Sequence, residues 1–271
     1  MQMAARWLMG TLLAAALGTG CGQRSLSMEQ STKTPVAPLF SQASREARVA
    51  LELQGRFVYE RNCLVCHGVW GDGHGELATN LVPQPRNLRT ARFKFRSTPS
   101  GFLPTDADLH RVITLGIAGT AMPTFAHLED RDVTAVVVYL KTFSRRWEDP
   151  RLQGKAVAIP DPPSWITETD GRLPHVLHGQ ELFLSNCASC HGVQGRGDGP
   201  AAAALVDEDG KPALTPDFSR GIWKSGPQPA DLYRTITTGI DGTPMPSFAD
   251  ALGINDRWDL VAFLSTLTSN R

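Results

Sequence analysis

The chain carries the motif Cys-x-x-Cys-His twice, and this repeated motif limits what it can fold into more than any other feature. The two copies occupy residues 63–67 and 187–191, 124 residues apart. The surrounding residues match at the same spacing, with Gly55 aligned to Gly179 and Tyr59 to Phe183. A long period with only two copies indicates a duplicated domain rather than a solenoid.

Each copy predicts an all-α domain. Apolar residues recur at positions 136, 139, 140 and 143 in one copy and at 260, 263, 264 and 267 in the other. This is the spacing of an amphipathic helix. Thr105 to Asp108 is typical of a capping box, and Pro229 stands in the equivalent first turn of the second copy. We also expect a helix that runs into each Cys-x-x-Cys motif.

The repeat divides the chain into five predicted parts. We expect a signal peptide at residues 1–20, a polar tether at 21–45 and one domain at 46–148. A linker stiffened by prolines follows at 149–172, and the second domain occupies 173–271.

The spacing of the motif indicates covalent haem. Its thiols stand about one helical turn apart, so Cys63 with Cys66, and Cys187 with Cys190, could add to the two vinyl groups of one porphyrin each. The histidine that follows, His67 or His191, would reach the iron. A zinc ribbon would need four ligands for each ion and could close only between the copies. A redox dithiol would leave the repeated histidine unexplained. We therefore predict two haem c groups.

The second axial ligand follows by elimination. Met1, Met3 and Met9 belong to the predicted signal and Met28 to the tether, which leaves Met122 and Met245. Both precede a proline at matched distances from their histidines, and a thioether raises the haem potential relative to a second histidine. The alternative is that these methionines only fill the core. We interpret the other histidines, such as His175 and His178, as ordinary surface or core residues.

The amino terminus predicts export and lipidation. Arg6, an apolar stretch and small residues precede Cys21, as in a secretory signal. Leu17 to Cys21 resembles a bacterial lipoprotein signal, in which the cysteine becomes the first residue and carries lipid. The alternative is an ordinary cleaved signal with an incidental cysteine. Lipidation of Cys21 would place the protein in the periplasm or on the outer face of a membrane.

Charge and glycine patterns exclude two classes of ligand. With 27 basic and 27 acidic residues, the chain gives no reason to expect a nucleic-acid partner. Gly71, Gly73 and Gly75 do not follow a strand, so they indicate positive φ angles in a tight loop rather than nucleotide binding. Five basic residues lie close together in the sequence: Arg86, Arg89, Arg92, Lys94 and Arg96. They could form a docking patch, or they could neutralise haem propionates or lie on a solvated face.

Because of these residues, both copies resemble class I cytochrome c domains. Together the two copies are similar to the dihaem cytochromes c of bacterial periplasmic electron transfer. The resemblance implies that the first and last helices of each domain cross at a glycine and an aromatic residue, here Gly55 with Tyr139 and Gly179 with Phe263. It also implies that a proline carbonyl accepts a hydrogen bond from the axial histidine, for which Pro85 and Pro216 are the candidates.

The function that the resemblance implies is the transfer of single electrons between respiratory redox partners, either a membrane complex or a soluble cytochrome. The alternative is a dihaem enzyme such as a peroxidase or a thiosulfate-oxidising cytochrome. Such enzymes need a vacant or exchangeable axial position, or an unusual ligand, whereas His67 with Met122 and His191 with Met245 would fill every position. A free carrier and a fixed subunit of a larger complex remain equal alternatives.

Overall fold

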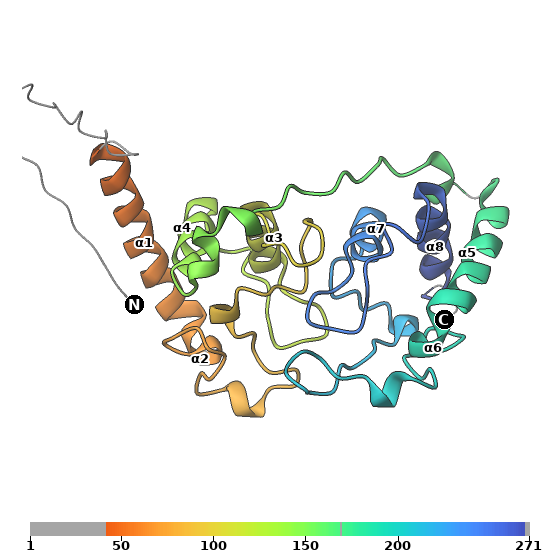
Figure 1. Ribbon diagram of the computed structural model, residues 1–271, viewed down its shortest axis with the longest axis horizontal. Helices are drawn as coiled ribbons and strands as arrows, with labels where there is room; N and C mark the ends of the chain where they lie inside the picture. The colour runs from red at the N-terminus through yellow and green to blue at the C-terminus, as the bar shows by residue number, and fades with distance from the viewer. Residues whose placement is uncertain (1–41, 169, 269–271) are drawn as a thin grey trace, which may run out of the picture. The chain divides into compact units, whose positions relative to one another are not determined.

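A computed structural model describes residues 42–168 and 170–268 and shows an all-α fold, as predicted (Figure 1). Two isolated bridges, between Leu103 and Gln153 and between Val206 and Pro212, are the β-type pairs among these residues. No helix in this part of the chain is long and apolar enough to cross a bilayer. The predicted signal, Cys21 and most of the predicted tether lie outside the described residues. The tether was predicted to reach residue 45, but helix α1 already begins at Gln42.

Helices occur in the same order in both halves. The α-helices of the first half are α1 (Gln42–Asn62), α2 (Leu64–His67), α3 (Asp106–Leu115) and α4 (Asp130–Lys141). Those of the second half are α5 (Arg172–Asn186), α6 (Ala188–His191), α7 (Pro229–Thr238) and α8 (Ile254–Thr266). Short 3-10 helices lie between them: η1 (Ala78–Asn80), η2 (Leu88–Thr90), η3 (Arg145–Glu148), η4 (Pro150–Leu152), η5 (Ser164–Ile166), η6 (Ala202–Ala204) and η7 (Phe218–Arg220).

Local sequence signals set the start of the middle helix in each half. Thr105 Oγ1 accepts a hydrogen bond from the Asp108 amide, and Asp108 Oδ2 accepts one from the Thr105 amide at 2.9 Å, so the predicted capping box is confirmed. Pro229 is the first residue of α7, where its missing N–H costs nothing.

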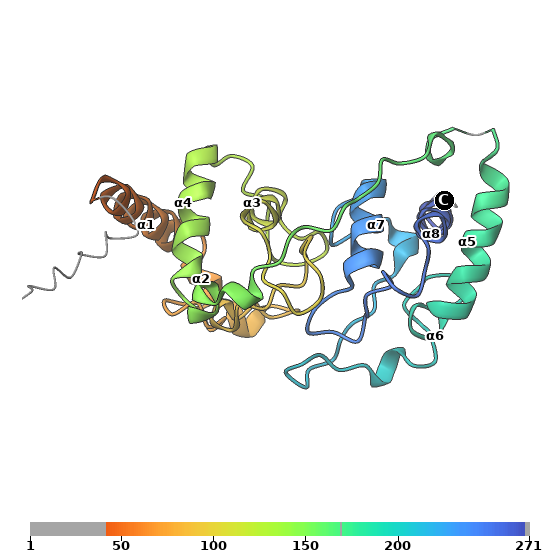
Figure 2. The same cartoon turned by 45° about the horizontal axis from the view of Figure 1, so that its top comes forward.

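The first and last helices of each half cross at a glycine, so α1 lies against α4 and α5 against α8 (Figure 2). A Cβ atom on Gly55 would lie 2.0 Å from the carbonyl oxygen of Ala135, and one on Gly179 would lie 2.0 Å from that of Asp259. Any side chain at either glycine would therefore push the two helices apart. Tyr139 and Phe263 line these crossings, as the resemblance implied.

The halves have separate apolar cores. One is built on α1, α3 and α4 and includes Tyr59 and Val136, and the other is built on α5, α7 and α8 and includes Trp258. Ile166 belongs to the second core, and Trp165 stacks on His175 with ring centres 3.7 Å apart. The packing of the second half thus begins before residue 173, the predicted domain boundary. At its other end the linker is tied to the first half, because the Val157 amide donates to the Ser97 carbonyl at 2.8 Å.

Two histidines on α5 share one buried carboxylate on α8. His175 Nδ1 lies 2.8 Å from Asp259 Oδ1, and His178 Nδ1 lies 2.7 Å from Asp259 Oδ2. The Asp259 side chain is only 7% exposed, whereas that of His178 is 46% exposed. The hydrogen bond to Asp259 is the main cause that raises the pKa of His178, with smaller contributions from the charges of Asp259, Asp256 and Glu181. Asp259 therefore ties α5 to α8 through two residues in the turn before Gly179.

This connection predicts a pH-dependent stability. Because the pKa of His178 is raised on folding, its pairing with Asp259 contributes fully below the unfolded pKa of about 6.5 and is lost as pH rises through the folded pKa. The pH-dependent part should be about 0.5–1 kcal/mol, since exposed pairs are worth little. Thermal unfolding of the haem-loaded protein should show that Asp259→Asn destabilises more at pH 5.5 than at pH 8.5. His127→Gln, at an exposed histidine of the other half, is the control and should show no such trend.

Candidate haem sites

Both Cys-x-x-Cys-His motifs form a turn of helix that continues the long helix before them. Cys63 lies between α1 and α2, and the His67 amide donates to the Cys63 carbonyl at 2.9 Å. The His191 amide donates to the Cys187 carbonyl at the same distance. The four cysteines that the structure describes are free thiols and half-buried. Burial raises the pKa of Cys63 to about 12 and that of Cys187 to about 11. Each motif therefore presents two reduced thiols beside one imidazole.

The glycine-rich turn after the first motif lies directly on it. Gly71 and Gly73 have φ angles of 64° and 82°, as predicted. The prediction is wrong for Gly75, which is not among the residues with positive φ. A Cβ on Gly75 would lie 2.3 Å from the Val65 carbonyl oxygen. Gly75 is therefore required by the close approach of two backbone segments and not by its φ angle.

His67 is oriented by a backbone carbonyl. Its Nδ1 lies 3.1 Å from the carbonyl oxygen of Arg86, which can only accept, so Nδ1 carries the proton and Nε2 keeps its lone pair. The prediction named the carbonyl of Pro85, one residue earlier, and is wrong on this point. The Pro85 carbonyl is turned toward Gly73 instead. A bond of this kind fixes the ring and increases the basicity of a metal-binding histidine.

His191 is oriented differently. Its Nδ1 is buried with no hydrogen-bond partner among the residues described, so the predicted bond to Pro216 is not formed. The ring instead stacks on Phe218, with centroids 4.8 Å apart and planes 19° apart. Trp223 stacks on the other side of Phe218, also at 4.8 Å. The first half has Leu88 where the second has Phe218, so it lacks this stack of rings.

Burial favours the neutral form of both imidazoles. It lowers the pKa of His67, against the opposing effect of the Arg86 carbonyl, and it lowers the pKa of His191 to about 4. A neutral imidazole is the form that binds a metal.

Met122 and Met245 lie on loops with the same internal hydrogen bonds. The Ile117 amide donates to the Met122 carbonyl at 3.0 Å, and the Ile240 amide donates to the Met245 carbonyl at 3.1 Å. In each loop a threonine hydroxyl, of Thr120 or Thr243, accepts from the methionine amide. Both methionines are half-buried, and Met122 packs on the core that also contacts Cys63.

Unpaired polar atoms in the interior fit a bound haem, which brings two carboxylates into each half. Buried N–H and O–H groups without a partner are costly, and several occur in the described part of the chain. They include Arg96 Nη1, Arg146 Nε and Trp147 Nε1 in the first half and Tyr233 Oη and Trp258 Nε1 in the second.

Most of the predicted positive patch faces the second half. Glu208 forms ion pairs with Arg86 and Arg92, and Arg96 forms one with Asp241 at 2.8 Å. The hypothesis that these three arginines belong to a docking patch for an outside partner is therefore wrong. Sequence reasoning missed Glu208 and Asp241, although Asp241 stands where the first copy has Ala118.

Comparison with known proteins agrees with this geometry. The family model described as cytochrome c matches residues 176–268, and that of the cbb3-type cytochrome c oxidase subunit III matches residues 50–140. A cbb3-type cytochrome c oxidase subunit FixP from Azorhizobium caulinodans is 26% identical over 79% of the chain. The chain spans only 59% of that relative's length. A cytochrome bc1 complex cytochrome c subunit from Corynebacterium diphtheriae is 24% identical, and the match covers 93% of this chain and 79% of that protein.

A solved structure is also similar. It is a chain of the Kuenenia stuttgartiensis reducing HAO-like protein complex Kustc0457/Kustc0458, with a TM-score of 0.73 and 39% identity over 79% of this chain and 95% of that one. Two family models, two cysteine pairs and two helical cores thus agree on two covalently bound haem c groups. The chain therefore contains two cytochrome c domains.

Proposed function

We propose that this chain is an exported, lipid-tethered dihaem cytochrome c that passes single electrons between respiratory redox partners as a subunit docked to a larger complex. The names of its relatives support the last point, since they are subunits of a cbb3-type oxidase and of a bc1 complex. The solved structure that it resembles is likewise part of a complex.

The observation that carries the proposal is that both halves have a histidine directly after the cysteine pair and a methionine on an equivalent loop. His67 and His191 end equivalent short helices with the same bond from the histidine amide to the first cysteine, and Met122 and Met245 lie on loops with the same internal hydrogen bonds. Haem c supplies a one-electron ferric–ferrous couple. With His and Met assigned to each iron, no axial position is left for a substrate, which favours a carrier over an enzyme.

The chain's own residues would attach the haem at each site and fix the orientation of the axial histidine. Cys63 and Cys66, and likewise Cys187 and Cys190, would form the thioether bonds. The carbonyl of Arg86 orients His67, while Phe218 and Trp223 orient His191. Sites that are rigid in this way need little rearrangement when they gain or lose an electron.

Carbon monoxide distinguishes the carrier from the dihaem enzymes. The dithionite-reduced holoprotein should show no change in its absorption spectrum with carbon monoxide, because both axial positions are filled. It should also show no turnover of hydrogen peroxide or thiosulfate. Met245→Ala is the control for sensitivity and should bind carbon monoxide at one haem of two. Binding by the wild type, or turnover of either substrate, would favour the enzyme and contradict the proposal.

Substitution of the methionines tests the ligands separately. Met122→His and Met245→His should each lower the potential of one haem and leave the other nearly unchanged. We expect a shift on the order of 0.1 V, a modest part of the roughly 0.8 V range that axial ligands span. Redox titration and the sulfur-to-iron charge-transfer band of the ferric protein report the result. A variant that keeps both potentials and the full band would show that its methionine is not a ligand.

The tether is tested through Cys21. Several acyl chains hold a protein stably at a membrane, whereas one does not. The intact mass of the native protein should show a chain that begins at a lipid-modified Cys21. Cys21→Ser should move the holoprotein from the membrane fraction to the soluble fraction. An unmodified amino terminus, or a wild type that is already soluble, would exclude the lipid anchor.

A further inference from the structure

The loop that carries Met245 is held by the other domain. Residues 239–245 make the same internal hydrogen bonds as residues 116–122 of the first domain. The two loops differ at their third residue, which is Ala118 in the first domain and Asp241 in the second, and at their sixth, which is Ala121 in the first and Pro244 in the second. A contact made by Asp241 therefore has no equivalent at Met122.

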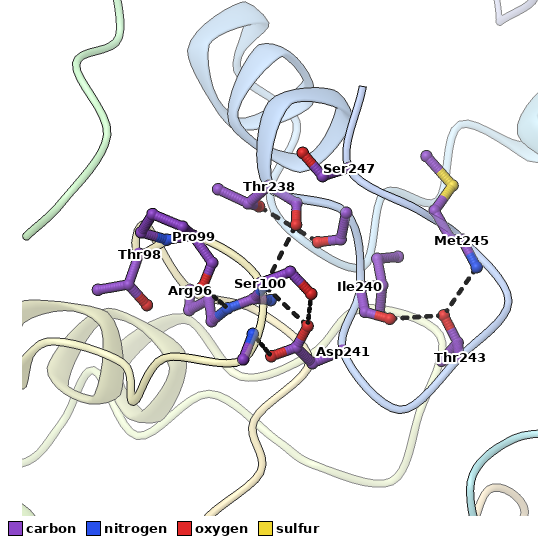
Figure 3. Close-up of polar contacts among 12 residues, drawn as sticks. Arg96, Thr98, Pro99, Ser100, Thr238, Ile240, Asp241, Thr243, Met245 and Ser247 are labelled. Carbon is purple, nitrogen blue, oxygen red and sulfur yellow. Dashed lines mark hydrogen bonds and ion pairs between the residues drawn. The ribbon is translucent and has the colours of Figure 1, made fainter. Parts of the chain in front are cut away.

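Asp241 accepts three contacts from the first domain (Figure 3). Ser100 Oγ donates to its Oδ1 at 2.7 Å, the Gly101 amide donates to its Oδ2 at 3.1 Å, and Arg96 Nη2 lies 2.8 Å from Oδ1. The same Arg96 Nη2 also donates to the carbonyl of Thr238 at 3.2 Å, at the end of α7 just before the loop. The loop is thus held at its start and at its third residue.

The Arg96 side chain has no exposed surface. Burial is the main cause that lowers its pKa, and the charges of Asp241 and Asp108 oppose that shift. A buried guanidinium that loses its carboxylate partner is strongly destabilising. Asp108 fixes the segment around Arg96, because its Oδ2 accepts bonds from the amide and hydroxyl groups of Ser97 and Thr105. The ion pair therefore joins two segments that are already ordered.

A second connection reaches the next residue of the loop. The Glu208 amide donates to the Gly242 carbonyl at 3.1 Å, and the Glu208 carboxylate pairs with Arg86 and Arg92 of the first domain. Because the Arg86 carbonyl accepts the bond from His67, hydrogen bonds and ion pairs run from the histidine of one haem site to the methionine loop of the other.

We propose that Arg96 is a positioning residue for Met245, and that its ion pair with Asp241 keeps this methionine on the iron of the second domain. The proposal rests on the assignment of Met245 as a ligand. Met122, whose loop has Ala118 in place of Asp241, does not depend on such a pair. The first domain therefore sets how firmly the second domain holds its axial ligand.

Competition with imidazole tests the proposal. Imidazole displaces a methionine from ferric haem, and the sulfur-to-iron band disappears as it does so. In Arg96→Gln and in Asp241→Asn, the imidazole concentration that removes the second domain's half of the band should fall about tenfold, which corresponds to about 1.4 kcal/mol. The half that belongs to Met122 should keep its wild-type midpoint. The double variant should be no more sensitive than the more affected single variant, because one interaction has been removed in all three.

Arg111→Gln is the matched control. Arg111 also joins the domains, through Ser225 and Asp231, but neither residue is in the loop. It should leave both imidazole midpoints unchanged. If Arg96→Gln does not fold, Asp241→Ala gives the second loop the residue of the first and should show the same tenfold change.

Three results would overturn the proposal, and they differ from one another. If Met245→Ala removes half of the band while Arg96→Gln and Asp241→Asn lower only the melting temperature, the pair is merely structural. If Met245→Ala leaves the band intact, Met245 is not a ligand, and the proposed function loses its ligand assignment as well. An Arg111→Gln variant as sensitive as Arg96→Gln would also contradict the specific role of the loop.

Discussion

The helix crossing at a glycine is the constraint on which each haem site depends. At Gly179 the backbones of α5 and α8 approach so closely that a Cβ would lie 2.0 Å from a carbonyl oxygen, and Gly55 is as restricted on α1. The crossing fixes the position in space of the carboxyl ends of α1 and α5, and each Cys-x-x-Cys-His motif begins at that end. The positions of the two thiols and the imidazole thus follow from a contact between two helices. In the second domain, Asp259 on α8 strengthens the crossing through His175 and His178.

Patterns that are local in the sequence predicted the fold well. The spacing of apolar residues and the capping box at Thr105 depend on neighbours within a few positions, and the structure confirms the helices they predict. Predictions that depend on how a loop closes were less accurate. The acceptor for His67 is Arg86 rather than Pro85, a shift of one residue that spacing alone does not resolve. His191 has no such acceptor and stacks on a ring, for which the sequence signal was Phe218 in place of Leu88.

Contacts between the domains could not be predicted from composition or periodicity. The arginines near residue 90 form a positive cluster in the sequence, yet their partners are more than 100 residues away. An ion pair of this kind depends on how two folded domains contact each other, and a single sequence carries no pattern that predicts this contact. The one available signal was the alignment of the two copies, in which Asp241 replaces Ala118 between a Gly-Ile pair and a Gly-Thr pair that both copies share.

The same alignment shows why the two haem sites are not equivalent. From Gly75 to Asn87 the first copy takes 12 steps along the chain, whereas the matching stretch from Gly199 to Asp217 takes 18, and the extra residues include the loop with Glu208. From Asn87 to Asp108 the first copy is the longer one, and its extra length lies in the segment that follows Lys94 and contains Arg96, Ser100 and Gly101. Each copy thus has an extension that the other lacks, and both extensions contact residues 239–245. These polar contacts are made to residues 239–245 and, in the part of the chain that the structure describes, have no counterpart at residues 116–122. The duplicated fold therefore produces two sites that have the same predicted ligands but differ in the contacts that hold the methionine loop.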